Sequence, residues 1–303
     1  MRRSQLMTCA VIVDACLGEP HRWHPLNGFG WLAGQIERFA YGPPALSPAR
    51  RRLRGALAVT GLILPWTLLV RRLIRPPLPA SLIEVLILYL GLGQRSLHEH
   101  ARAVSTALAA GDEAQARHHA SLLVSRDPQA LEIIPATLES VLENGNDAVF
   151  GALCWFVLAG APGVIVYRLA NTLDACWGYR NARYRDFGWA AARLDDILNY
   201  LPARLTALTY AHLGKPLMAL ECWWRQASAW ESPNAGPVMA AGAGALAVRL
   251  GGPARYAGQW RARPPLGGGA APQVQDLERG LRLIRQGVAA WLAVIAAWEA
   301  RYA

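Results

Sequence analysis

The chain has 303 residues, of which 53% are hydrophobic and only 17% are charged, and its formal net charge is +10. Soluble domains usually carry about 25% charged residues, so this composition argues against an ordinary soluble domain, and its apolar content argues against a disordered chain. Thirty of the 31 basic residues are arginines scattered among apolar runs, without the basic stripe or tail of a nucleic-acid-binding protein. We therefore expect several membrane helices separated by sizeable polar segments, and no nucleic-acid partner.

The first third of the chain contains three apolar runs. Residues 6–13 form a short run that Asp14 interrupts, which favours an interfacial or re-entrant segment over a signal peptide. Residues 53–74 have an uncharged core with arginines at both ends, and these side chains can reach the polar interface of a membrane. Residues 78–93 contain Glu84. A lone carboxylate at mid-membrane costs about 3 kcal/mol, so this helix either faces protein or forms half of a helical hairpin.

The remaining segments complete an all-helical pattern. Residues 94–147 are polar and predict amphipathic helices beside the membrane. Residues 148–170 are apolar but are broken at residues 160–163, as in a kinked spanning helix or a hairpin that turns inside the bilayer. Residues 242–272 are rich in Gly and Pro and predict a loop, and residues 277–298 predict a closing apolar helix. Alternating strand patterns are absent. The predicted fold class is all-α, a polytopic integral membrane protein with about four or five membrane-embedded helical segments and amphipathic polar helices between them.

Three carboxylates recur at a spacing of four residues. Glu139, Glu143 and Asp147 would lie on one face of a continuous helix, where like charges repel slightly. A sequence that keeps them fits a site for Mg²⁺ held together with nucleotide phosphates. A solvated acidic face just before the membrane is the alternative interpretation.

A dense polar block follows the apolar run of residues 148–170. Tyr167, Asn171 and Asp174 share one helix face at the end of that run, where uncompensated polar groups are costly, so they indicate either a functional site or helix capping. Residues 179–204 then alternate arginines with aspartates, and Asp195 shares a helix face with Asn199. This pattern predicts a network of paired groups or a site that presents both charges; a juxtamembrane helix with internal ion pairs is the alternative.

Two turns carry further polar residues. Gly18 and the prolines near it predict a fixed turn that carries Asp14, Glu19 and His24. Residues 232–236, Ser-Pro-Asn-Ala-Gly, predict a tight turn whose exposed backbone N–H groups could receive an anion. A phosphate-binding P-loop, a dinucleotide fingerprint and a serine-nucleophile elbow are all missing from the sequence.

The motifs taken together resemble one family. They are DACLGEPHRWHP (14–25), VSRD (124–127), ESVLENGND (139–147), the long block from Tyr167 to Leu205, and SPNAG (232–236). They are similar to those of the CobD/CbiB family of cobalamin biosynthesis, the adenosylcobinamide-phosphate synthases, and they run almost from end to end of the chain. The long block is the most specific of them because of its length and unusual composition.

This resemblance implies a single family domain over residues 1–303, in a multi-pass enzyme of the bacterial cytoplasmic (inner) membrane. The implied reaction is an ATP-dependent amide ligation of (R)-1-aminopropan-2-ol, or its O-phosphate, to the free propionate of adenosylcobyric acid, which gives adenosylcobinamide or its phosphate. ATP and Mg²⁺ would enter as substrate and activating ion, with no bound prosthetic group. The implied partners are the corrinoid, aminopropanol phosphate, membrane lipid and other late enzymes of the pathway.

The implied reaction distributes roles over the polar residues. One of Asp174, Asp195 and Asp196 would take the amine proton, and Glu139, Glu143 and Asp147 would hold the metal or nucleotide. The remaining candidates would bind substrate: Asp14, Glu19, His24, Asn171, Arg180, Arg183, Arg185, Arg193, Asn199 and Asn234.

Two other classes remain as alternatives. A polytopic membrane transporter or sensor without ligase activity also places charges within the membrane, although a transporter favours inverted repeats and long continuous spans, which this sequence does not show. A soluble all-α scaffold is the second alternative.

Overall fold

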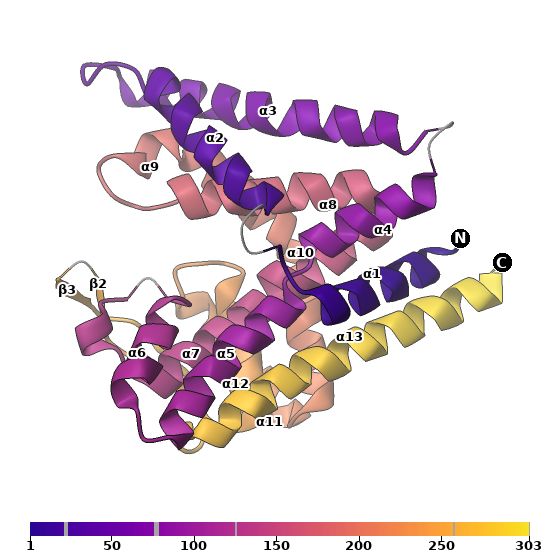
Figure 1. The fold of residues 1–303 in the computed structure, drawn as a ribbon. Helices are drawn as coiled ribbons and strands as arrows, with labels where there is room; N and C mark the ends of the chain where they lie inside the picture. The colour runs from indigo at the N-terminus through magenta and orange to yellow at the C-terminus, as the bar shows by residue number, and fades with distance from the viewer. Residues whose placement is uncertain (21–23, 76–78, 125, 257, 303) are drawn as a thin grey trace. The chain divides into compact units, whose positions relative to one another are not determined.

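The structure, a computed structural model, describes residues 1–20, 24–75, 79–124, 126–256 and 258–302. Within these ranges it is built almost wholly of helices (Figure 1). The chain divides into two compact units, each made of two separate stretches. Met1–Gly93 and Gly151–Asn199 form unit 1, and Gln94–Phe150 and Tyr200–Ala303 form unit 2. That residues 1–303 act as one family domain stays a prediction.

Unit 1 is organised around helix α8. Helices α2, α3 and α4 all pack on α8, and α1 packs on α4. Trp177 near the end of α8 packs edge-on against Phe187, with ring centroids 5.0 Å apart. The helices of this unit are α1 (Arg3–Leu17), α2 (Pro25–Ala40), α3 (Pro48–Leu73), α4 (Ala80–Gly91), α8 (Gly151–Trp177), α9 (Tyr184–Phe187) and the first part of α10 (Trp189–Leu213).

Helix α8 reverses direction at Gly160. This residue has φ 65° and ψ −158°, a conformation that is accessible almost only to glycine. A Cβ placed on Gly163 would lie 2.6 Å from the carbonyl oxygen of Trp155, and one on Gly151 would collide with the Tyr167 hydroxyl. A straight helix with a rise of roughly 1.5 Å per residue would hold residues 151 and 167 about 24 Å apart. Of the two forms expected for residues 148–170, the structure therefore shows the helical hairpin.

The apex of this hairpin also explains how the apolar segment of residues 78–93 accommodates the carboxylate of Glu84. A Cβ on Gly160 would lie 3.4 Å from the Oε1 atom of Glu84 on α4. The carboxylate is thus directed at the protein, as one of the two interpretations of residues 78–93 required, because lipid offers a carboxylate no polar partner.

Unit 2 is built around α12, which is buried along its whole length. Its sequence of small residues allows close approach: a Cβ on Gly244 would lie 2.7 Å from the carbonyl oxygen of Met218 on the neighbouring α11. Helices α7, α11 and α13 all contact α12. The helices are α5 (Gln94–Ala109), α6 (Glu113–Ser121), α7 (Ile133–Asn144), the later part of α10, α11 (Pro216–Gln226), α12 (Ala235–Leu246) and α13 (Val274–Tyr302), with short turns at Pro128–Ala130, Gly145–Phe150 and Ala227–Ala229.

The prediction of a loop over residues 242–272 is wrong, because this segment contains the end of a helix and several short strands. Helix α12 continues to Leu246, and four short strands follow it. Strand β1 (Arg249–Gly251) pairs antiparallel with β4 (Pro265–Gly267), and β2 (Ala254–Tyr256) pairs antiparallel with β3 (Gln259–Arg261). Strands of three residues are too short to show an alternating pattern.

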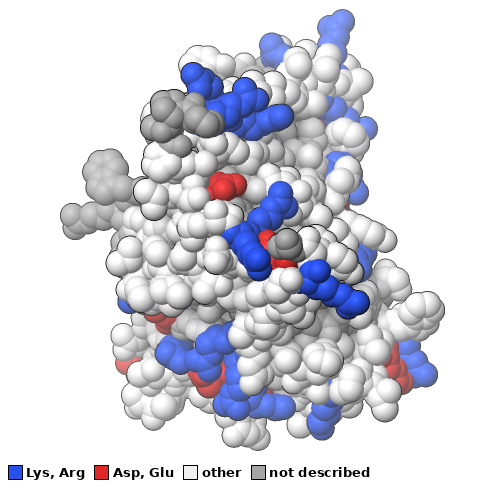
Figure 2. Space-filling model, turned by 90° about the vertical axis from the view of Figure 1, so that its right-hand side faces the viewer, with Lys and Arg blue, Asp and Glu red and all other residues white. Residues whose placement is uncertain are grey.

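Among the residues that the structure describes, four helical stretches are long and apolar enough to cross a membrane, judged by length and composition: Pro48–Leu73, Ala80–Ala109, Ile133–Trp177 and Val274–Tyr302. The third contains the reversal at Gly160. Helix α3 presents an apolar outer face, with Leu53, Leu57 and Leu68 each more than half exposed. Figure 2 shows one face of the molecule on which charged side chains gather in clusters separated by uncharged surface. The predicted class, an all-α polytopic membrane protein, is confirmed, although two candidate spans extend into residues 94–147, which were expected beside the membrane.

Candidate active site

Unit 1 holds a largely buried carboxylate, Asp195, bound by neutral amides. The Nδ2 atom of Asn199, one helical turn along α10, donates to both carboxylate oxygens at 3.1 Å, and Nδ2 of Asn171 on α8 donates to Oδ1 at 3.3 Å. The Tyr167 hydroxyl donates to Oδ1 of Asn199 at 2.8 Å. Tyr167 and Asn171 are one turn apart on α8, as Asp195 and Asn199 are on α10, so two faces with the same spacing meet. The missing Cβ of Gly151 leaves room for the Tyr167 hydroxyl.

The surroundings of Asp195 favour its protonated form. Burial raises the pKa of this carboxyl, and the charge of Asp196 raises it further. The hydrogen bonds from Asn171 and Asn199 and the positive charge of Arg168 act in the opposite direction but do not cancel the rise. A carboxylate whose pKa is moved toward neutrality is a more effective proton acceptor at physiological pH.

A second aspartate lies beside this centre. Asp196 Oδ2 pairs with Nη1 of Arg193 at 3.0 Å. Burial raises the pKa of Asp196, against the charges of Arg193 and Arg180. Asp174 lies at the end of α8 with its carboxylate against Gly178, where a Cβ would collide with it. Of the three predicted catalytic aspartates, Asp195 is enclosed by a network of side-chain amides.

Two of the predicted substrate-binding arginines, Arg183 and Arg185, form ion pairs within unit 1. Arg183 donates from Nε to Oε1 of the buried Glu37 on α2 at 2.8 Å, and the Tyr184 hydroxyl donates to Oε2 of Glu37 at 3.2 Å. Arg185 is exposed and lies 3.7 Å from Asp186. Arg183 therefore ties α2 to the segment before α9. Glu37 was not predicted from the sequence, where it shows only as an acidic residue on the apolar face of an amphipathic helix.

The N-terminal turn lies near the carboxylate centre, because the charge of Arg168 acts on residues of both. His24 caps α2, its Nδ1 accepting from the backbone N–H of Leu26 at 3.2 Å. Burial lowers the pKa of His24; the charge of Glu19 opposes this and that of Arg168 adds to it. Arg168, the one charge in the apolar run, thus acts on both His24 and Asp195, and the prediction omitted it. Asp14 is buried on α1. Residues 21–23 of the same motif lie outside the described residues.

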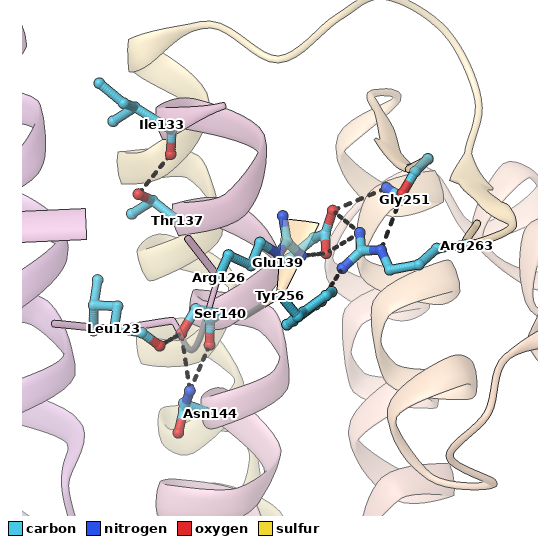
Figure 3. A network of polar contacts seen from close by, with 11 residues as sticks. Leu123, Arg126, Ile133, Thr137, Glu139, Ser140, Asn144, Gly251, Tyr256 and Arg263 are labelled. Atoms are coloured by element: carbon cyan, nitrogen blue, oxygen red, sulfur yellow. Dashed lines mark hydrogen bonds and ion pairs between the residues drawn. The ribbon is translucent and has the colours of Figure 1, made fainter. Parts of the chain in front are cut away.

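Unit 2 contains a different polar centre around Glu139 of α7 (Figure 3). Glu139 is 3% exposed and lies between two guanidinium groups. Arg263 donates from Nη2 to both carboxylate oxygens at 2.9 and 2.7 Å, Arg126 donates to Oε2, and the backbone N–H of Gly251 donates to Oε1 at 2.9 Å. Arg263 also donates from Nη1 to the Tyr256 hydroxyl at 3.2 Å. None of these partners was predicted. Arg126 belongs to the VSRD motif, to which no partner was assigned, and the others lie in the segment that was expected to be a loop.

Glu139 and the side chains of Arg126, Tyr256 and Arg263 line a polar cavity of about 230 Å³. Ser140, Glu143 and Asn144 from α7 also line it. Burial acts to lower the pKa of Arg263, but the charge of Glu139 and the hydrogen bonds to Glu139 and Tyr256 outweigh it, and the net shift is upward. The guanidinium therefore stays charged inside the protein. Ser125 of the VSRD motif lies outside the described residues.

The predicted metal cluster is not formed. Among the residues that the structure describes, no group of three or more His, Cys, Asp or Glu side chains could hold a metal ion. Glu139 is engaged by two arginines, and a π-helical turn, Gly145–Phe150, begins after Glu143 and contains Asp147. A π turn contains more residues than an α turn, so it breaks the spacing that placed the three carboxylates on one face. Asp147 instead accepts from Nδ2 of Asn146 at 2.8 Å.

The Ser-Pro-Asn-Ala-Gly turn uses its own donors. The Ser232 hydroxyl accepts from the backbone N–H groups of Asn234 and Ala235 at 3.3 and 3.1 Å, and the Ser232 carbonyl accepts from that of Gly236 at 3.3 Å. The side-chain oxygen of Asn234 accepts from Nη1 of Arg204 at 2.6 Å. The expectation that these N–H groups would receive an anion is therefore wrong for this conformation.

The fold is that of a polytopic helical membrane protein, and it encloses an ionisable group, Asp195, among neutral amides. The family model of the CobD/CbiB protein matches residues 7–284, and the chain belongs to this family.

Known relatives agree along nearly the whole length. The chain is 55% identical over 299 residues to the cobalamin biosynthesis protein CobD of Chromobacterium violaceum, covering 97% of this chain and 96% of that protein. It is 54% identical over 289 residues to the protein of the same name from Stutzerimonas stutzeri, covering 94% of each. The CobD of Rhodobacter capsulatus is 40% identical over 309 residues, with 97% of each covered. No solved structure is a significant match. These relatives support a role for the chain in cobalamin biosynthesis.

Proposed function

We propose that the chain is a ligase of the bacterial cytoplasmic membrane that joins an amine to a corrinoid acid. The amine is (R)-1-aminopropan-2-ol or its O-phosphate, and the acid is the free propionate of adenosylcobyric acid. The product is adenosylcobinamide or its phosphate. Family membership supports the pathway, and the amide-bound, largely buried Asp195 is the single structural observation that supports the chemistry.

Amide formation poses two chemical problems. A carboxylate is a poor acyl donor, so in this proposal the propionate is first phosphorylated, with ATP as the phosphoryl donor. An alkylamine has a pKa near that of lysine, about 10.4, and is therefore mostly protonated and not nucleophilic at neutral pH. One proton must pass from the ammonium to a base before the nitrogen can attack. As the new C–N bond forms, the acyl C–O bond to phosphate breaks, and the second proton leaves with inorganic phosphate. Asp195 is that base, because its raised pKa makes it a competent acceptor.

The neighbouring groups support this role by position. Asn171 and Asn199 fix the carboxylate, and Tyr167 fixes Asn199. Arg193 and Arg180, whose charges act on Asp196, would bind an anionic group of a substrate. Mg²⁺ would accompany ATP. We assign it no ligands in the chain, since Glu139, Glu143 and Asp147 do not form a metal site.

Growth of a strain that lacks this protein tests the proposed reaction. Cobinamide should support cobalamin-dependent growth, because it lies beyond the proposed step, whereas cobyric acid should support growth only when the chain is supplied. A transporter or sensor without ligase activity predicts another pattern. Growth of the deficient strain on both compounds, or on neither, contradicts the ligase.

A further inference from the structure

Unit 1 contains an apolar cavity of about 440 Å³ that the proposed reaction does not use. Helices α2, α3, α4 and α8 each contribute to its wall. The side chains that line it are apolar, among them Phe29, Val70, Leu90 and Val164, with one exception, Arg168. A corrinoid, whose periphery carries several amide groups, is poorly matched to such walls because its polar groups would lose their hydrogen bonds to water.

The mouth of the cavity has the composition of a membrane interface. Gly28, Trp31 and Trp66 line the cavity and are exposed, with Trp31 at 68% and Trp66 at 45%. Trp66 lies near the end of the candidate span α3, shortly before Arg71 and Arg72. Tryptophan and arginine concentrate where the hydrocarbon of a bilayer meets its headgroups. The opening is therefore placed at the level where lipid phosphates lie.

We propose that this cavity is a binding site for a phospholipid, with an acyl chain between α2, α3, α4 and α8 and the headgroup phosphate beside Arg168. The apolar walls match the chain, and the guanidinium matches the phosphate in charge and geometry. The occupant comes from the membrane, since three of the four helices belong to stretches long and apolar enough to span one. The lipid supplies no step of the ligase chemistry, although the charge of Arg168 also acts on Asp195.

A pair of glycines on α2 provides a matched test. Gly28 lines the cavity and Gly34 does not, yet a Cβ on either would meet no atom within 4 Å. Leucine is a better helix former than glycine, so Gly28→Leu and Gly34→Leu should both fold. Only the first places a side chain in the cavity.

The experiment purifies the wild-type protein and both variants from membranes in mild detergent and measures bound phospholipid by mass spectrometry. Wild-type protein and Gly34→Leu should each retain about one phospholipid more per chain than Gly28→Leu. Occupancy of the cavity by phospholipid should therefore be at least threefold lower in Gly28→Leu. Equal retention by the two variants would overturn the proposal.

Labelling of the unaltered protein provides a second measurement. The probe is phosphatidylglycerol with a photoreactive group in its acyl chain, in vesicles that contain the wild-type protein. Adducts should map to cavity residues such as Val70, Leu90 and Val164, and Arg168→Gln should reduce them. Adducts confined to the outer face of α3 would contradict a lipid site. Adducts at the cavity that disappear when adenosylcobyric acid is added would also contradict it, because they would indicate a corrinoid site.

Discussion

At the scale of single residues, the two polar centres differ in the groups that bind their carboxylates. Glu139 is bound by two guanidinium groups, whereas the groups that donate hydrogen bonds to Asp195 are neutral amides. Pairing with opposite charge compensates a buried ion. Neutral donors compensate it only partly, and burial leaves the pKa of Asp195 raised. Glu139 is therefore suited to holding elements together, and Asp195 to exchanging a proton.

The first prediction concerns Asn171→Ala and the pH dependence of ligation. The base must be ionised to act, so kcat/KM falls as pH drops through the pKa of Asp195. The hydrogen bond from Asn171 favours the ionised form, so its loss raises that pKa further. The acid limb of the pH profile should move to higher pH, while the rate well above the pKa changes less. Asn27→Ala, an exposed position on α2, is the control. An unmoved limb, or one displaced to lower pH, would refute the assignment of the base.

The second prediction concerns the stability of unit 2. Glu139→Gln removes the partner of two guanidinium groups that are each 12% exposed. Breaking a buried pair in this way costs about 3–5 kcal/mol. The control, Glu113→Gln, removes an exposed partner of Arg117 and should cost less than about 1 kcal/mol. Denaturant unfolding in detergent measures both, and equally small changes would show that the Glu139 network does not stabilise unit 2.

At the scale of the elements, the hairpin of α8 depends on a single residue, Gly160, at which the helix reverses direction. Gly160→Ala should destabilise the protein by about 1–3 kcal/mol, because its φ of 65° with ψ of −158° suits only glycine. Gly61→Ala provides the control: it lies within α3 with open space around it and should be neutral or stabilise by up to about 1 kcal/mol. Thermal unfolding of both variants in detergent distinguishes the cases. Indifference to both changes would mean that the chain does not reverse at this residue.

The sequence predicted these elements unevenly, for physical reasons. Apolar runs of sufficient length identify α3 and α13, and the break at residues 160–163 was visible, although periodicity cannot distinguish a kink from a reversal. The π turn was invisible because no residue pattern marks it, and its presence undid the predicted alignment of Glu143 with Asp147. The strands in residues 249–267 are too short for a period of two to appear.

The candidate site was predictable to the extent that it is local. Asp195 with Asn199, and Tyr167 with Asn171, follow from one-turn spacing along a helix. Contacts between distant segments were not predictable. Glu37 meets Arg183 across 146 residues, and Arg263 meets Glu139 across 124. Such pairs depend on tertiary packing, which a single sequence does not reveal.

At the scale of the whole molecule, the proposed proton acceptor Asp195 lies on α10 and is hydrogen-bonded to Asn171 of the candidate membrane span Ile133–Trp177. The most direct measurement incubates purified protein with adenosylcobyric acid, ATP and aminopropanol phosphate and follows the product by mass spectrometry. Wild-type protein should form adenosylcobinamide phosphate, and Asp195→Asn should be about 10²–10⁴-fold slower.

Asp112→Asn is the control for this measurement, because Asp112 is an exposed cap of α6 and asparagine caps helices equally well. This variant should match the wild type. Failure of the wild-type protein to form the product would contradict the ligase, and a wild-type rate for Asp195→Asn would contradict its assigned base.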